Sequence, residues 1–337
     1  MSRTANNRSR LDNFSFGTGH PHFLSIRCLI ILGLYLKKKL RITIIWKYLR
    51  DRRIWMQHIA DWEGYRFDYR DSGTGPVILL IHGTQSDYRE VYHVERLIEA
   101  GYRIIVPSRP GYGKTPLRVA SSPGELAAFY RRWLASRHLE RYTVYGISAG
   151  GPTAIALASG NPAVSSLVLA CAMTHQISLP YQDWLVQPLL QRPLQLVQWI
   201  LWHYVKDKLV KFPQEASVRM VEMTSLLQRD EIRRQLDGAD QQLLYQVGLQ
   251  NGPGRGVLFD LTQQIDRPLL QAIRCPVLIV HSKADRAVPF EHALYARRAI
   301  AHAQFIESAS PGHLIWIGPS ARRDERMIER FIALNHL

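Results

Sequence analysis

A serine, an aspartate and a histidine stand in sequence contexts that suit nucleophilic catalysis. Ser148 is the central residue of Gly146-Ile-Ser-Ala-Gly150, a G-x-S-x-G pattern. A serine hydroxyl is a poor nucleophile until a base removes its proton, and that base needs a carboxylate to orient it. Asp285 and His313 each follow a β-type run later in the chain, and we predict them to be that carboxylate and that base. The G-x-S-x-G pattern alone is weak evidence, so its flanking elements decide its value.

The residues around Ser148 predict a strand, a sharp turn and a helix. Tyr142–Tyr145 is strand-like, and small residues, Gly146 and Gly150, stand two positions before and after the serine. A serine on such a turn takes a strained backbone conformation, which only small neighbours allow to pack closely. The alternative is an ordinary turn of small residues, which would not explain the placement of the predicted carboxylate and base.

Acyl transfer also needs an oxyanion hole built from backbone N–H groups. One donor is expected at Ala149, the residue after the serine. The other is expected at Thr84, because the apolar run Val77–Ile81 leads into His82-Gly83-Thr84. Gly83 permits an unusual turn there, and we expect His82 to shape this loop rather than act as the base.

From about residue 60 the sequence alternates β-rich and helical stretches, which predicts an α/β fold with right-handed crossovers. Several predicted strands are continuous apolar runs, as in parallel sheets covered on both faces. The predicted strands are 65–69, 77–81, 103–107, 142–146, 166–171, 277–281 and 304–307. The predicted helices are 88–99, 123–137, 151–159, 291–301 and 321–334.

Residues 173–265 interrupt this alternation with helical sequence broken by prolines. Inserted between two strands of one sheet, such a segment predicts a cap over the carboxyl ends of the strands, where ligands bind in open sheets. The alternative is a set of ordinary core helices. The segments 60–172 and 266–337 then form the predicted α/β core.

The chain resembles the α/β-hydrolase superfamily of capped serine hydrolases over residues 60–337. Five segments in the expected order carry the resemblance: His82-Gly83, the loop 107–115, the elbow 146–151, the loop 285–289 and Gly312-His313. The resemblance implies a mostly parallel sheet with helices on both faces, a helical cap insertion, and the order Ser148, Asp285, His313 of nucleophile-elbow enzymes. The chain departs from the family at Ser108, where Asp is common, and at Ser282, where Gly is common.

The resemblance also narrows the chemistry. Family members that hydrolyse epoxides or alkyl halides carry Asp at the elbow, and the iminopeptidases carry a Gly-rich loop that residues 82–86 do not match. We therefore expect a serine hydrolase, most simply a carboxylic ester hydrolase acting through an acyl-enzyme on a small-to-medium apolar substrate, with no cofactor and no metal. The alternatives are hydrolysis of carbon–carbon bonds, lactones or thioesters, and a non-catalytic binding or membrane-scaffold protein of the same fold.

Three competing motifs are weaker. Gly113-Lys114-Thr115 lacks the earlier glycine of a phosphate loop, since position 108 is Ser, and the same segment lacks the third glycine of a dinucleotide fingerprint. His281 and Asp285 stand four residues apart, but no further ligand cluster accompanies them, so we prefer a site without metal.

The N-terminal segment carries most of the charge. The chain has 43 Lys and Arg against 28 Asp and Glu, a net of +15, and residues 1–55 hold +10 of it. We expect residues 1–21 to be a disordered tail and residues 22–57 a basic, Trp-bearing amphipathic extension. Its apolar run is too short to span a bilayer. Two interpretations stand: a helix bound to an anionic membrane surface, and a helix packed on the core. Specific nucleic-acid binding is not expected, because no recognition motif accompanies the charge.

The three cysteines, Cys28, Cys171 and Cys275, are far apart. This spacing excludes a zinc-finger pattern and a disulfide scaffold, and it fits a reducing compartment. We therefore expect a cytoplasmic protein, peripheral on the inner face of a membrane if the N-terminal extension binds lipid.

Overall fold

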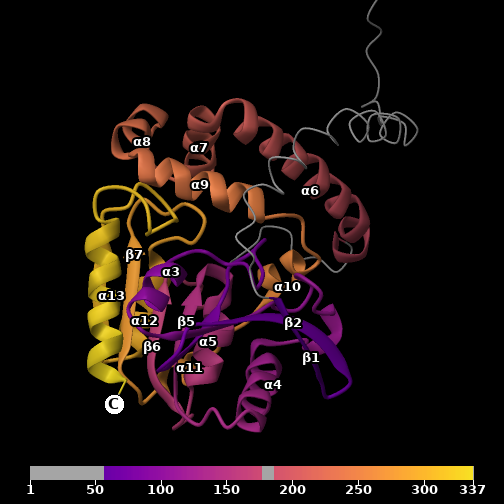
Figure 1. The fold of residues 1–337 in the computed structure, drawn as a ribbon, viewed down its shortest axis with the longest axis vertical. Helices are drawn as coiled ribbons and strands as arrows, with labels where there is room; N and C mark the ends of the chain where they lie inside the picture. The colour runs from indigo at the N-terminus through magenta and orange to yellow at the C-terminus, as the bar shows by residue number, and fades with distance from the viewer. Residues whose placement is uncertain (1–56, 177–185, 337) are drawn as a thin grey trace, which may run out of the picture. The chain divides into compact units, whose positions relative to one another are not determined.

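The computed structural model describes residues 57–176 and 186–336 (Figure 1). The predicted tail, 1–21, and the predicted extension, 22–57, lie outside the described residues except for Gln57, which begins the first strand. No helix in the described ranges is both long enough and apolar enough to cross a membrane.

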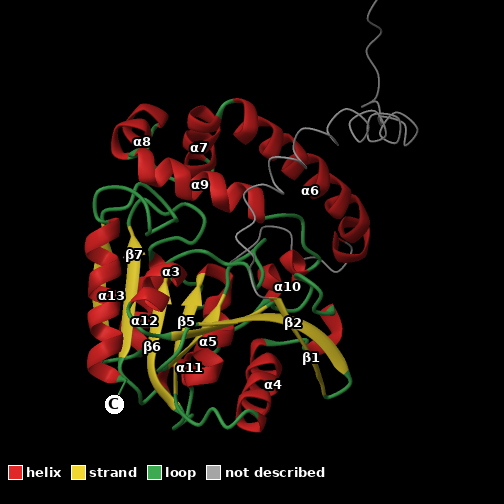
Figure 2. Cartoon of the chain, viewed as in Figure 1, coloured by secondary structure: helices red, strands yellow, loops and turns green. Residues whose placement is uncertain are grey.

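Within the described residues, eight strands form one mixed sheet, shown in Figure 2. Their order across the sheet is β1-β2-β4-β3-β5-β6-β7-β8. β1 pairs antiparallel with β2, and β2 with β4, whereas all later neighbours are parallel. The strands are β1 (Gln57–Trp62), β2 (Tyr65–Ser72), β3 (Val77–Ile81), β4 (Arg103–Pro107), β5 (Tyr142–Ile147), β6 (Val164–Ala170), β7 (Val277–Ser282) and β8 (Gln304–Ser308).

Helices cover both faces of the sheet, and the alternation of side chains along a strand divides the core accordingly. In β3, Leu79 packs in one cluster, with residues of α4 (Pro123–Ser136), α5 (Gly151–Ala158), α11 (Arg267–Gln271) and α12 (Glu291–Ala299). Its neighbours Ile78 and Leu80 pack in the other cluster, with α3 (Val94–Glu99) and α13 (Ala321–Asn335). The continuous apolar runs of the sequence therefore reflect strands that are buried on both sides.

A group of helices lies between β6 and β7 in the chain and beyond the carboxyl ends of the strands (Figure 1). They are α6 (Val186–Lys211), α7 (Pro213–Glu222), α8 (Arg229–Gln235), α9 (Gly238–Gln250) and α10 (Gly256–Thr262). This is where the sequence predicts a cap, although the boundaries 173 and 265 stay predictions. α9 begins with a capping box in which Asp237 and Asp240 each accept the other's backbone N–H.

The predicted helix 88–99 is wrong over its first half, because α3 begins only at Val94. The carboxylate of Glu90 accepts the backbone N–H groups of Val91 and Tyr92, at 2.9 and 3.3 Å, and His93 has a left-handed φ of 63°. Local side-chain bonds thus replace the helical pattern. The sequence does not predict the antiparallel strand β1, because its residues are exposed or half-buried and therefore form no continuous apolar run.

Gly150 lies where the loop after β3 meets the turn after β5. A Cβ at this position would stand 2.2 Å from the carbonyl oxygen of Ile81 and 2.8 Å from that of His82. Both contacts are backbone atoms, which cannot rotate away, so only glycine fits this approach.

We predict that Gly150→Ala lowers the free energy of unfolding by about 1–3 kcal/mol, the usual cost of overpacking a well-packed site. Urea unfolding of the purified protein measures it. Gly238→Ala is the matched control, because a Cβ on Gly238, the first residue of α9, meets nothing within 4 Å, and its effect should stay within about 0.5 kcal/mol. Equal stability of the two variants would contradict the prediction.

Candidate active site

Ser148 stands at the turn between β5 and α5, where the chain reverses sharply. Its φ is +50°, in the left-handed region that non-glycine residues rarely adopt. A short 3₁₀ turn, Ser148–Gly150, leads directly into α5, and the N–H of Met173 holds the Ser148 carbonyl at 2.9 Å. Surrounding contacts thus maintain a strained conformation, as is common at functional sites.

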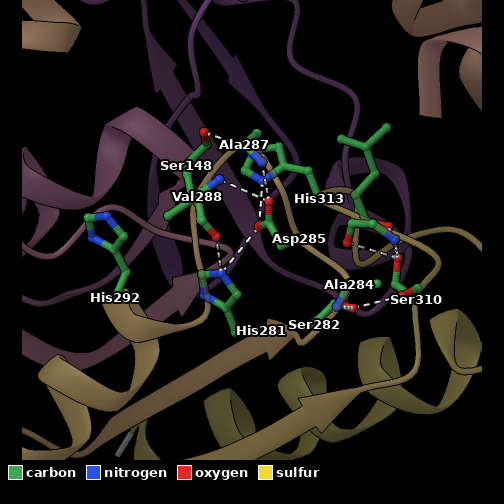
Figure 3. Close-up of polar contacts among 12 residues, drawn as sticks. Ser148, His281, Ser282, Ala284, Asp285, Ala287, Val288, His292, Ser310 and His313 are labelled. Atoms are coloured by element: carbon green, nitrogen blue, oxygen red, sulfur yellow. Dashed lines mark hydrogen bonds and ion pairs between the residues drawn. The ribbon is translucent and has the colours of Figure 1, made fainter. Parts of the chain in front are cut away.

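The structure brings Ser148, His313 and Asp285 into one hydrogen-bonded chain (Figure 3). His313 Nδ1 lies 2.7 Å from Asp285 Oδ2, and its Nε2 lies 2.9 Å from Ser148 Oγ. In the neutral tautomer that fits these contacts, Nδ1–H donates to the carboxylate and Nε2 accepts the serine hydroxyl. Nε2 is then the atom free to take the serine proton.

Asp285 is buried and remains ionised because several donors converge on it. Oδ1 accepts the backbone N–H groups of Ala287 and Val288, each at 2.9 Å. Burial alone would raise the pKa of Asp285, but the charge of His313 and the hydrogen bonds from His281 and His313 outweigh burial and lower it to about 2. The carboxylate therefore stays charged at neutral pH and can orient the imidazole.

His281 is a second histidine on this carboxylate, although its spacing from Asp285 in the sequence suggested only a metal ligand. Its Nε2 lies 3.2 Å from Asp285 Oδ2 and 2.9 Å from the carbonyl oxygen of Val288. The four-residue spacing was visible in the sequence, but its meaning depends on the turn that follows β7. Among the described residues, no three His, Cys, Asp or Glu side chains form a group suited to a metal ion.

The loop after β3 packs closely against the elbow at Gly83. A Cβ on Gly83 would stand 3.2 Å from Ser148 Cβ. His82 is fully buried behind this loop; its Nδ1–H donates to the Gly83 carbonyl and its Nε2 accepts the N–H of Arg109, both at 2.8 Å. Burial, aided by the charge of Arg109, lowers the pKa of His82 well below its usual value. His82 is thus neutral and committed to backbone contacts.

A segment between α7 and α8, residues 224–226, holds the loops of both Asp285 and His313. No pattern in the sequence indicated this role. The hydroxyl of Ser225 donates to the carbonyl of Pro311, two residues before the histidine. The N–H of Leu226 bonds to the Ala284 carbonyl at 2.8 Å, and the Thr224 carbonyl accepts the N–H of Arg286 at 3.1 Å. Contacts between residues this far apart, 86 positions for Ser225 and Pro311, leave no local pattern in the sequence.

The two departures from the family pattern also have structural partners. Ser282 Oγ donates to the carbonyl of Ser310 at 2.7 Å and so ties the loop after β7 to the loop after β8. Ser108 Oγ accepts the N–H of Tyr88 at 3.1 Å. Near Ser108, the buried carboxylate of Asp68 accepts the N–H of Lys114 at 2.9 Å. Asp68 thus supplies a carboxylate in the region where family members often have Asp at position 108.

A cavity of about 360 Å³ opens beside Ser148 and His313. Its wall is mostly apolar, and Glu90 and Asp260 are its only acidic lining residues in the described ranges; those ranges contribute no Lys or Arg to the lining. Burial raises the pKa of Glu90. The larger apolar side chains that line the cavity are Tyr92, Met173, Leu201, Trp202, Met220 and Trp316.

The fold agrees with comparisons to known proteins. Residues 78–326 match the model of the alpha/beta hydrolase family, so the chain belongs to that family and is a hydrolase. It is 34% identical over 274 residues to the uncharacterized hydrolase YcgS of Bacillus subtilis, covering 80% of this chain and 96% of that one.

One further sequence relative and one solved structure are also similar to this chain. A 2-hydroxy-6-oxononadienedioate/2-hydroxy-6-oxononatrienedioate hydrolase of Dechloromonas aromatica is 27% identical over 67% of this chain and 76% of its own. An alpha/beta hydrolase fold protein from Nakamurella multipartita superimposes with a TM-score of 0.67 at 23% identity, covering 82% of this chain and 98% of that chain. The structural likeness shows the fold, and the fold alone does not determine the substrate.

We predict that Ser148→Ala abolishes labelling by a fluorophosphonate probe, because the probe reacts only with an activated serine. Ester hydrolysis, measured in parallel, should fall by on the order of 10⁴–10⁶-fold. Ser136→Ala, an exposed serine at the end of α4, is the control and should label like the wild type. Labelling of the Ser148→Ala protein would rule out Ser148 as the nucleophile.

We predict that the stabilising effect of Asp285 disappears in acid. Its pKa in the folded protein, about 2, lies below the ordinary value of 3.8, so the contribution is fully present above about pH 4 and is lost as the pH falls toward 2. The shift corresponds to about 2 kcal/mol. Urea unfolding of wild type and Asp285→Asn should therefore give a difference in unfolding free energy that shrinks by about that amount between pH 7 and pH 2. A constant difference would contradict the assigned charge state.

Proposed function

We propose that this hydrolase cleaves carboxylic esters of neutral, apolar acyl groups through an acyl-enzyme on Ser148. The observation that carries the proposal is the hydrogen-bonded chain Ser148–His313–Asp285, which opens onto an apolar cavity. The substrate is a small molecule, since the cavity measures about 360 Å³.

The proposed reaction has two acyl-transfer steps. Ser148 Oγ attacks the ester carbonyl while His313 Nε2 takes its proton, and Asp285 stabilises the resulting imidazolium. The backbone N–H groups of Thr84 and Ala149 hold the oxyanion of the tetrahedral intermediate. His313 then protonates the leaving alcohol, and it activates a water molecule that releases the acid and restores the serine.

The charges around the cavity favour neutral acyl groups over dicarboxylates. The Dechloromonas relative acts, by its name, on dioates. A carboxylate bound in this cavity would find no Lys or Arg among the described lining residues, and it would approach the buried Glu90. An unpaired buried charge is costly, so carbon–carbon hydrolysis of a dioate is less favoured. Lactones and thioesters form the same acyl-enzyme, so they are the next substrates to screen.

The interpretation as a non-catalytic binding or scaffold protein is not favoured, since the serine, base and carboxylate are within hydrogen-bonding distance of one another. Binding of residues 22–57 to an anionic membrane surface stays a prediction, as does the cytoplasmic location. The described residues include no helix that is long and apolar enough to span a membrane.

We predict that kcat/KM rises with acyl length across a panel of 4-nitrophenyl esters from acetate to octanoate. Each buried methylene contributes about 0.8 kcal/mol, so acetate to butyrate should gain roughly tenfold before the cavity fills and the series levels off. The hemisuccinate ester is the charged control and should be hydrolysed at least tenfold more slowly than the butyrate. A preference for acetate, or for the charged ester, would contradict an apolar acyl site.

A further inference from the structure

Asp260, on α10, lies at the centre of a buried hydrogen-bond network beside the elbow. Its Oδ1 accepts Arg109 Nη1 at 2.5 Å and Gln263 Nε2 at 3.1 Å. Its Oδ2 accepts Arg109 Nη2 at 3.0 Å, the Tyr112 hydroxyl at 2.6 Å and the Thr84 hydroxyl at 3.0 Å. Both charged side chains are almost completely buried, at 0% and 1% exposure for Arg109 and Asp260. Five donors on one carboxylate fix it in a single position.

The same ion pair contacts both residues proposed to supply the oxyanion donors. Asp260 holds Thr84 by accepting a hydrogen bond from the Thr84 hydroxyl. Arg109 holds Ala149 through its carbonyl oxygen, which accepts Nη1 at 3.2 Å. One charged pair, contributed by the loop after β4 and by α10, thus spans the two sides of the proposed oxyanion hole.

Arg109 also orients the Thr84 N–H through its own backbone. The N–H of Arg109 donates to His82, and His82 donates to the Gly83 carbonyl. That carbonyl and the N–H of Thr84 belong to the same peptide group, which is planar and trans, so the two point in opposite directions. Fixing the carbonyl therefore fixes the direction of the N–H.

The network is rigid because its supports are backbone contacts. The N–H of Arg255 bonds to the Gly111 carbonyl at 3.0 Å. A Cβ on Gly256 would stand 2.3 Å from the ring of Tyr112, and one on Gly111 would stand 2.4 Å from the backbone nitrogen of Gly256. The start of α10 is thus seated directly on the loop that carries Arg109. Burial alone would lower the pKa of Arg109, but Asp260 more than offsets it and raises the pKa, so the guanidinium stays charged.

We propose that Asp260 and Arg109 are a positioning pair for the oxyanion hole: the pair fixes the direction of the Thr84 N–H and holds Ala149, the residue that carries the second donor, by its carbonyl. The inference rests on the proposed acyl-transfer function. Because the pair acts through the transition-state charge, losing it should lower kcat and leave KM nearly unchanged. A purely structural role, holding α10 on the core, would change stability and not this kinetic pattern.

Thr84→Val is the test variant, because it removes the hydroxyl while it keeps the side-chain shape, the backbone N–H and the buried ion pair. Loss of a whole oxyanion donor costs about 10²–10³-fold, so a misdirected donor should reduce kcat by roughly 10- to 100-fold, with KM within about twofold. Affinity for a boronic acid, which binds serine as a tetrahedral anion, should fall in proportion to kcat, and affinity for the product acid should not change.

Two matched variants separate positioning from stability. Thr84→Ser keeps a hydroxyl and should restore kcat and boronic acid affinity to within about threefold of wild type. Thr262→Val makes the same chemical change at an exposed threonine of α10 and should leave both unchanged. In the double variant with Asp260→Ala, the Thr84→Val effect should vanish, because each change removes the same contact. If Asp260→Ala does not fold, the Thr84 pair still decides the question.

Fluorophosphonate labelling rates of the same proteins separate the two proposals. If wild type labels rapidly and Thr84→Val labels tenfold or more slowly, both proposals are supported. If wild type labels rapidly and Thr84→Val matches it in labelling rate, kcat and boronic acid affinity, the positioning pair is wrong while the serine hydrolase stands. If wild type does not label and hydrolyses no ester, both are overturned.

Discussion

The candidate site depends on keeping one buried carboxylate ionised. Asp285 satisfies its two oxygens with two N–H groups of its own turn and with two histidines. Without these donors, burial would favour the protonated acid, and a neutral carboxyl group could not hold His313 in the tautomer that leaves Nε2 facing Ser148. The hydrogen bond of His281 to the Val288 carbonyl closes the same turn. In the proposed mechanism, the orientation of the base, and through it the activation of the serine, follows from this arrangement.

The parallel sheet explains why four distant loops meet at this point. The carboxyl ends of β3, β5, β7 and β8 carry Thr84, Ser148, Asp285 and His313 respectively, and parallel neighbours place these ends at one edge. The sheet alone fixes positions only coarsely. Two contributions from the helical region refine them. The segment at Ser225 ties the loops after β7 and β8 together, and Asp260, through its ion pair with Arg109, ties the loop after β3 to the elbow. The helices beyond the strand ends thus support the chemistry as well as lining the cavity.

Sequence patterns were sufficient where structure follows from local periodicity or local backbone demands. The buried strands β3 and β7 were predicted from continuous apolar runs and β5 and β6 from β-rich runs, and the turn at Ser148 required its small neighbours. Prediction failed where contacts between distant residues decide the outcome. Residues 88–93 of the predicted helix form a loop, because the Glu90 carboxylate accepts the backbone N–H groups of the two residues that follow it. Arg109 and Asp260 pair across 151 positions of sequence, and neither residue stands in a pattern that marks its partner.

Surface charge and site charge are separate properties in this chain. The sequence carries a net charge of +15, yet the described residues that line the cavity include two acidic side chains and no Lys or Arg. One of those acids, Asp260, is neutralised by Arg109 behind the cavity wall, and burial raises the pKa of the other, Glu90. A ligand inside the cavity therefore meets apolar side chains and almost no compensating positive charge. The basic composition argues for attraction between the surface and anions at long range, whereas the low-polarity cavity selects against anions at contact range. Under the proposed function, the second effect governs substrate choice, because only bound groups experience the full cost of desolvation.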